Sequence, residues 1–152
     1  MPNIQSAAVG FNPVPGGELY LNTDQDNLVS GVPTKVELDT VNGEWTDGIE
    51  DTGNHRILPG VAGRYLVIGQ VMFTNVIAGK KYEANVQRSG AQRITGYKYS
   101  SLTENLTIRI SSVLILTAIQ YLELWAVSNA DVDTVDIKSG MSYTHLTVQR
   151  VG

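Results

Sequence analysis

Three closely spaced aspartates are the best candidate metal ligands in the sequence. Asp131, Asp133 and Asp136 lie in the acidic segment 129–136. Hard carboxylate oxygens at short spacing suit Ca²⁺, although the spacing departs from that of an EF-hand loop. The apolar residues between and after these aspartates are typical of the margin of a strand. The segment therefore predicts either a calcium site or a solvated acidic loop.

A second group of polar and aromatic residues lies in a predicted loop over residues 46–55. Asp47, Glu50 and Asp51 fall inside this loop, and Trp45 lies just before it. Exposed loops carried by a rigid scaffold are common places for ligand recognition. We therefore consider these four residues a candidate ligand-binding loop, with charges that only increase solubility as the alternative.

The sequence contains no arrangement of residues that is typical of a catalytic site. His55 and His145 are the two histidines, and no Gly-x-Ser-x-Gly elbow frames Ser111, Ser112 or any other serine. There is no cysteine, which excludes thiolate catalysis and Cys-ligated zinc. No GxGxxG, P-loop or HExxH motif occurs either. The expected class is a non-enzyme without a cofactor, and an enzyme such as a small-sugar isomerase or lyase on a related sandwich is a distant alternative.

Two tyrosines lie at a spacing that places them on one face of a strand. Tyr97 and Tyr99 are two residues apart, so their side chains project the same way if the segment is extended. With Trp45 and Tyr143 they would offer an aromatic platform for a carbohydrate. Packing in a core or a subunit interface is the alternative, because aromatic residues fill sandwiches routinely.

The composition indicates one domain with a surface poorer in charge than usual. The chain has 152 residues, of which 42% are hydrophobic and 17% charged, below the roughly 25% charged residues of average domains. The low fraction of charged residues favours oligomerisation, because more of the surface than usual must be neutral or covered. The net charge is −4 without a basic block, so we expect no nucleic-acid partner. Neither an apolar run of about 18 residues nor a secretion signal is visible, so we expect no membrane partner and synthesis in the cytoplasm.

The remaining pattern is that of an all-β domain. Residues 1–17 are rich in Pro and Gly and predict an extended arm, whereas residues 18–152 show short Val-, Ile-, Thr- and Tyr-rich runs between turn residues. Asn42-Gly43 is a strong hairpin signal. The expected strands cover residues 34–39, 64–73, 82–87, 95–100, 106–110, 121–127 and 142–151.

Two of the expected strands, residues 64–73 and 121–127, are apolar on both faces. One face of a sheet in a two-sheet sandwich normally meets water, so such strands need a second cover. A partner subunit is the simplest cover, and the arm or the loop over 46–55 folding back is the alternative. The residues that we predict at the subunit interface are Tyr65, Val67, Val71, Phe73, Tyr121, Leu122, Leu124 and Trp125.

The order of these elements over residues 32–152 resembles the C1q-like branch of the C1q and tumour-necrosis-factor superfamily, including its bacterial and phage members. Segment 63–73 looks like the family's Gly-x-Tyr strand that ends in Phe. The other matching segments are residues 35–39, 82–89, 114–127 and 142–151. Two features depart from the family: Ile119-Gln120 stands where a Gly-Asp pair is common, and no Gly-X-Y collagen stalk precedes the domain.

The resemblance implies an antiparallel jelly-roll sandwich of ten strands whose three copies pack around a threefold axis. Our function hypothesis is a homotrimeric virion component of phage type, either a capsid decoration protein or a head fibre, held on the particle by residues 1–17. A segment poor in apolar residues can order on a partner, and this favours attachment through the arm. The alternative is a receptor-binding tip of a tail fibre that grips a glycan or a protein with its loops.

Overall fold

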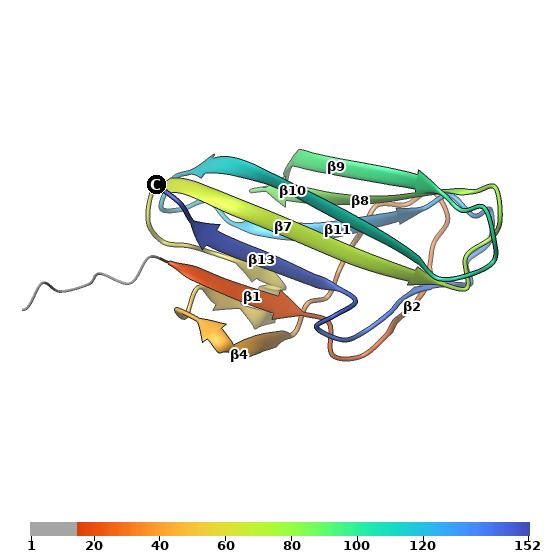
Figure 1. Cartoon of the computed structure of the whole chain (residues 1–152), viewed down its shortest axis with the longest axis horizontal. Helices are drawn as coiled ribbons and strands as arrows, with labels where there is room; N and C mark the ends of the chain where they lie inside the picture. Colours follow the sequence, from red (N-terminus) through yellow and green to blue (C-terminus); the bar gives the residue numbers. More distant parts are fainter. Residues whose placement is uncertain (1–14) are drawn as a thin grey trace, which may run out of the picture.

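Two antiparallel β-sheets pack face to face over residues 15–152, which are the residues described by the structure, a computed structural model (Figure 1). The seven-stranded sheet has the order β2-β12-β7-β13-β1-β4, and β10 pairs with the other edge of β7. The six-stranded sheet has the order β5-β6-β11-β8-β9, and β3 also pairs with β11. The strands are β1 Gly16–Tyr20, β2 Gln25–Leu28, β3 Thr34–Lys35, β4 Thr40–Thr46, β5 Glu50–Asp51, β6 Arg56–Ile57, β7 Gly63–Thr74, β8 Lys81–Arg88, β9 Ala91–Tyr99, β10 Leu106–Leu116, β11 Leu122–Ser128, β12 Val135–Ile137 and β13 His145–Arg150.

Helical structure is confined to one short turn in this part of the chain. The 3₁₀ turn η1 covers Thr52–Asn54, and the Asp51 side chain accepts a hydrogen bond from the Asn54 amide at its start. Within residues 15–152 no helix has the length and the apolar character needed to cross a membrane. The all-β prediction is therefore confirmed.

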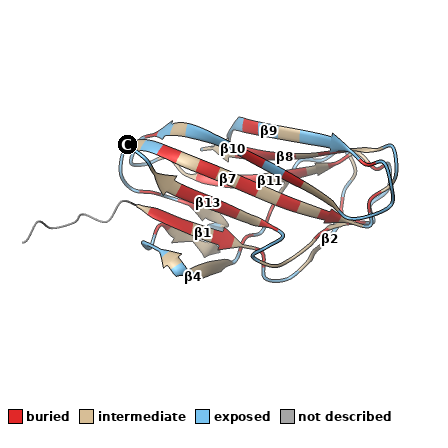
Figure 2. Cartoon of the chain, in the orientation of Figure 1, coloured by how far each residue is buried: buried red, intermediate tan, exposed pale blue. Residues whose placement is uncertain are grey.

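Strand β7 shows how side-chain alternation divides the molecule into an inside and an outside. Its odd-numbered side chains point into the space between the sheets, and its even-numbered ones point away, since successive side chains of a strand face opposite ways. Figure 2 shows this as alternating buried and half-buried colours along β7. The inward side chains, which are fully buried, are Tyr65, Val67, Val71 and Phe73.

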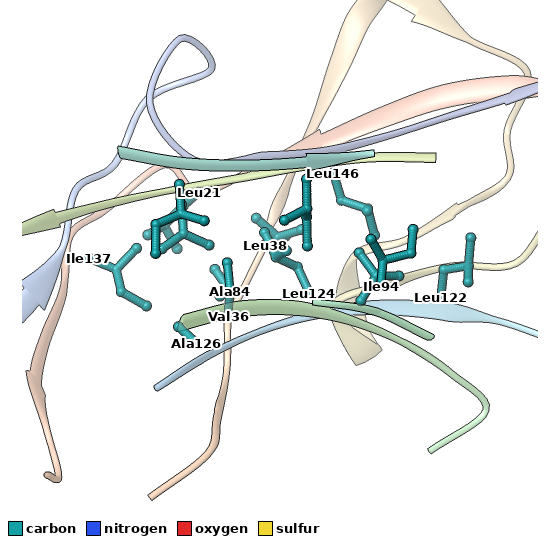
Figure 3. Packing of buried hydrophobic residues seen from close by; sticks show 14 of the residues in the cluster. Leu21, Val36, Leu38, Ala84, Ile94, Leu122, Leu124, Ala126, Ile137 and Leu146 are labelled. Carbon is teal, nitrogen blue, oxygen red and sulfur yellow. The ribbon is translucent and has the colours of Figure 1, made fainter. Parts of the chain in front are cut away.

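The core between the sheets is closely packed by aliphatic side chains from both layers (Figure 3). Two aromatic rings anchor one region of it: the ring centroids of Phe73 and Tyr82 lie 5.3 Å apart in a tilted arrangement. The Tyr82 hydroxyl leaves the apolar region and accepts a hydrogen bond of 2.7 Å from the Ile77 amide. The hydroxyl is therefore satisfied although its side chain is fully buried.

Several predicted elements differ from the structure near the beginning of the domain. The predicted strand 34–39 is regular only in β3, yet Val36 and Leu38 are fully buried as their alternation indicated. Asn42-Gly43 lies inside β4 and forms no hairpin turn, because β4 continues past it to pair with β1 through an irregular register. The predicted loop 46–55 contains β5 and η1, so it is more ordered than its polarity indicated.

The boundary between arm and domain lies earlier than predicted. Gly16 and Gly17 belong to β1, where they pair with Gln149 and Val148 of β13. The Pro15 carbonyl also accepts a 2.9 Å hydrogen bond from the Arg150 amide. Of the predicted arm over residues 1–17, residues 1–14 lie outside the described residues, whereas residues 16–17 are part of the sheet.

The two sheets meet along β9 and β10 without backbone pairing between these strands. Gly96 allows their close approach, since a Cβ atom there would lie 2.5 Å from Cγ2 of Ile110. Side chains bridge the seam instead: the Lys98 ammonium donates to the Thr107 carbonyl at 2.7 Å, and the Arg88 guanidinium donates to the Ile115 carbonyl at 2.8 Å.

Candidate functional site

The outer face of the seven-stranded sheet is a surface that the fold builds from several strands at once. Directly opposed residues of antiparallel strands point to the same face. The pairing registers therefore align outward side chains in three rows across β1, β13, β7 and β10. The rows are Gly16, Gln149, Leu66 and Val113; Glu18, Thr147, Ile68 and Ser111; and Tyr20, His145, Gln70 and Arg109.

This outer face is apolar toward the end where β1 begins. Leu66 and Ile68 are half-buried in the single chain, and Met72 continues the same face of β7. On the neighbouring strand β10, Val113 is 52% exposed and Ile115 is 67% exposed. Exposed aliphatic side chains that form one contiguous area mark interaction surfaces more often than isolated ones do.

Polar groups lie beside Ile68 in the middle row and toward the opposite end of the same face. The Thr147 hydroxyl donates to the Glu18 carboxylate, which also accepts a 3.2 Å hydrogen bond from the Asn42 amide group. Gln70 donates from Nε2 to the Ser142 carbonyl at 2.8 Å. The outer face therefore combines an apolar area with a fixed arrangement of polar groups.

His145 lies among these polar groups and has a perturbed pKa. Its Nδ1 lies 2.8 Å from the Met141 carbonyl oxygen, which can only accept, so Nδ1 carries the proton. Burial lowers the pKa of His145 below its ordinary 6.5, and the Arg109 charge acts in the same direction. The Glu18 charge and the Met141 carbonyl oppose this lowering only in part.

Acidification is expected to reduce the free energy of unfolding through His145. Because the pKa in the folded chain is below 6.5, the unfolded chain takes up the proton first as the pH falls through this window. The contribution of neutral His145 to stability is complete above the pKa of the unfolded chain. It is lost as the pH falls from there toward the pKa of the folded chain. Urea denaturation from neutral pH to about pH 5 should show a smaller pH dependence for His145→Asn than for the native chain. Identical pH profiles would contradict this role of His145.

The interface residues predicted from β7 are wrong, because the structure places them in the core. Tyr65, Val67, Val71 and Phe73 are 0% exposed in the single chain, so none of them can contact a second copy. Leu122 and Leu124 of β11 are also 0% exposed and point inward. The surface available on β7 is the opposite one, which carries Leu66, Ile68 and Met72.

The outward residues of β11 are covered by side chains of the same chain. The Arg56 guanidinium lies 4.6 Å from the centre of the Tyr121 ring. Trp125 donates from Nε1 to Glu123 at 3.2 Å, and Glu123 also forms a 3.1 Å salt bridge with Lys35. Tyr121, just before β11, and Trp125 within it are therefore partly covered by side chains of the same chain.

The aspartates predicted to bind calcium do not converge on a common point. Asp136 accepts hydrogen bonds from the Asn27 amide at 2.8 Å and from the Asn75 side chain at 2.7 Å. Asp133 accepts from the Ser30 amide, and Asp131 pairs with Lys80. Within residues 15–152 no three His, Cys, Asp or Glu side chains are grouped so as to hold a metal ion. The carboxylates instead tie three loops together.

The predicted ligand-binding loop is also occupied by internal contacts. Asp47 accepts a 2.8 Å hydrogen bond from the Gly16 amide, and Glu50 accepts one of 2.6 Å from the Thr46 hydroxyl. Asp51 pairs with Arg56 at 2.8 Å, which together with the Asn54 amide group lowers the Asp51 pKa. Trp45 is half-buried in β4. Asp47 therefore ties this segment to β1, whereas Glu50 and Asp51 form hydrogen bonds with residues close to them in the sequence.

The predicted aromatic platform is brought together only in part. Tyr97 and Tyr99 lie side by side on β9, whereas Trp45 belongs to the other sheet and Tyr143 to the segment before β13.

The two histidines each contact a backbone carbonyl, His55 that of Leu38 at 3.0 Å. The turn before β11 is closed by Gln120, whose side-chain oxygen accepts from the Thr117 amide at 3.0 Å.

Comparisons with known proteins identify the fold. No family model matches the sequence, and no curated protein matches it. Among solved structures, Eiger TNF from S. frugiperda matches with a TM-score of 0.70 and 13% identity over 92% of this chain and 94% of that chain. Murine APRIL, in a crystal structure at pH 5.0, matches with a TM-score of 0.70 and 13% identity over 91% of this chain and 100% of that chain. The chain has a C1q/TNF-like jelly-roll fold, which confirms the resemblance at the level of the fold.

Proposed function

We propose that the protein is a non-enzymatic homotrimer that assembles through the outer face of its seven-stranded sheet. The observation that carries this proposal is the apolar area of Leu66, Ile68, Val113 and Ile115, which the single chain leaves partly or largely open to water. The TNF-like fold supports threefold assembly, as the resemblance implies.

The charges on this face are compatible with contact between identical copies. Glu18 lies on β1 and Arg109 on β10, on opposite sides of β7 in the sheet order. A face that carries both signs can place unlike charges together when copies meet, which favours a defined register. Covering about 300 Å² of apolar surface per subunit at about 25 cal/mol per Å² contributes on the order of 7 kcal/mol before association costs.

The trimer is expected in solution without any partner. Light scattering over a concentration series should give three times the chain mass of 16.5 kDa. Dissociation on dilution would still show a concentration-dependent mass, because association follows mass action. A mass of 16.5 kDa at every concentration would contradict the proposal.

Within this proposal the trimer is a virion component of phage type, a capsid decoration or head-fibre protein, held on the particle through residues 1–14. The position of β1 supports this role: the Pro15 carbonyl bonds Arg150, and the Arg64 amide donates to the Gly152 carbonyl at 2.6 Å. The first strand and the C-terminus therefore lie at one end of the sandwich, and attachment there leaves the other end free (Figure 1).

The structure sharpens the deletion that tests attachment. Removing residues 1–17 would also remove Gly16 and Gly17 from β1, so the deletion should end at residue 14. The shortened chain should keep the trimer mass and lose cosedimentation with virus particles of its source. Cosedimentation equal to that of the full chain would contradict attachment through this segment.

A further inference from the structure

An aromatic and charged patch on the outer face of the six-stranded sheet is used by neither the core nor the proposed trimer. Tyr97 is 60% exposed and Tyr99 is 64% exposed, although both follow a well-paired strand. Large aromatic side chains with this exposure are unusual for a surface without a ligand or partner. Figure 2 shows β9 as a mostly exposed strand on the side away from β13.

The registers of β8 and β9 show which residues surround these rings. Tyr99 lies opposite Lys81, and Tyr97 lies opposite Glu83. The intervening residues of β8, Tyr82 and Ala84, are fully buried in the core, so their odd-numbered neighbours point outward. We call these four outward residues, Lys81, Glu83, Tyr97 and Tyr99, the tyrosine patch.

The rings of the tyrosine patch are held in place rather than free. Their centroids are 6.2 Å apart, with an interplanar angle of 89°. The Lys81 ammonium lies 4.7 Å from the centre of the Tyr97 ring and 3.3 Å from the Glu83 carboxylate. Binding to a patch of fixed rings costs less ordering entropy than binding to mobile side chains.

Asn85, the next outward residue of β8, provides a second observation. It lies between Thr95 of β9 and Trp125 of β11 and is only 2% exposed. Its Oδ1 atom has no hydrogen-bond donor within residues 15–152. A buried amide oxygen without a donor is unfavourable, so Asn85 leaves an unsatisfied polar atom directly beneath the surface in the row next to the tyrosine patch.

The geometry points to the tyrosine patch as a saccharide-binding site. A pyranose ring presents C–H groups that pack on an aromatic face, while its hydroxyl groups accept from Lys81 and donate to Glu83. A purely apolar partner fits less well, because the two charges beside the rings would lose their water. The patch lies on the opposite sheet from the proposed trimer face, and its residues are not among those that carry the trimer proposal.

The place of the patch in the molecule agrees with ligand capture. Strand β9 runs toward the end of the sandwich that is remote from the start of β1 and from the C-terminus (Figure 1). Tyr99 is the last residue of β9 and so lies toward this remote end. A chain attached by its N-terminal segment would therefore present the patch outward.

A glycan array tests this inference, followed by calorimetric titration of the strongest arrayed oligosaccharide into the full chain. The variant with Tyr97→Ala and Tyr99→Ala should lose at least about ten-fold in affinity. Tyr143→Ala is the matched control, since Tyr143 is 45% exposed but lies in the other half of the sandwich, and it should bind like the native chain. Light scattering should give both variants the native mass.

Three results would overturn the inference. They are silence of the whole array, native affinity of the double variant, and a change of oligomer mass in the double variant, which would make the tyrosines a subunit contact. A native chain that is monomeric yet binds an oligosaccharide through Tyr97 and Tyr99 would support the site while contradicting the trimer. The two proposals can therefore fail separately.

Discussion

Replacing Ile68 by aspartate should convert the trimer into a folded monomer. Ile68 lies on the outer face of the seven-stranded sheet, in the same row as Glu18 and Thr147. In the single chain this position is only half-buried, so a carboxylate there keeps contact with water. In the trimer it would be an unpaired buried charge in a row that already carries the Glu18 carboxylate, which costs several kcal/mol. Light scattering should report 16.5 kDa, and circular dichroism should report an unchanged fold.

Two further substitutions make this result specific. Val113→Asp alters the same face at a position that is 52% exposed, so it should dissociate the trimer with even less effect on the fold. Val29→Asp is the matched control, because Val29 is 51% exposed but lies after β2, away from this face. A native mass for both Ile68→Asp and Val113→Asp would show that the copies meet elsewhere.

Replacing Phe73 by alanine should reduce the free energy of unfolding by about 3–5 kcal/mol. Phe73 is 0% exposed, and its ring packs against Tyr82 with a centroid separation of 5.3 Å. Removing the ring leaves a cavity between the sheets that β7 and β8 cannot close without moving their backbones. Denaturant titration at one fixed protein concentration measures the loss, and Phe73→Leu should retain most of the stability.

The same variant separates a core residue from an interface residue. If Phe73 lay between subunits, its removal would yield a folded monomer with little change in the stability of each chain. A core position instead predicts that the assembled chain unfolds at a lower denaturant concentration. A folded monomer of nearly unchanged stability would instead show that Phe73 lies at a subunit interface, as the sequence pattern predicted.

The sequence was sufficient to locate the main strands but misassigned the face of β7. Both sets of alternating residues in β7 are rich in apolar side chains, so hydrophobicity alone does not separate them. The decisive signal is in the polar positions: Arg64, Gln70 and Thr74 share one set, and the other set has no polar residue. In β11, Glu123 marks the outward set in the same way. The set of alternating residues that includes polar side chains therefore identifies the outer face of a strand, whereas the number of apolar residues in each set does not.

The first strand was missed because its glycines serve packing rather than flexibility. A Cβ atom on Gly17 would lie 2.0 Å from Oε1 of Glu50, so a larger residue there would displace the Glu50 carboxylate. Glycine has a low intrinsic propensity for β-strands. Here Gly16 and Gly17 nevertheless adopt a strand because they pair with β13. Asn42-Gly43 was misread for the same reason, since the long-range pairing of β4 with β1 decides its conformation.

The candidate sites were harder to predict than the fold. Asp131, Asp133 and Asp136 have the chemistry of calcium ligands, but their oxygens accept from loop amides and pair with a lysine. Those partners lie far away in the sequence, so spacing alone cannot reveal them. Tyr97 and Tyr99 were recognisable as a pair because one strand holds both, whereas the residues that flank them depend on the register with β8.

The side chains of Lys98 and Arg88, which reach β10 from β9 and β8, also bear on how the molecule avoids aggregation. An open strand edge recruits strands from other molecules, because its carbonyl groups stand ready to accept hydrogen bonds. On β10 the carbonyls of Thr107 and Ile115 are already taken by Lys98 and Arg88. An incoming strand would have to displace both cations and cover their charge. These two acceptors on the free edge of β10 are therefore unavailable to a strand of another molecule.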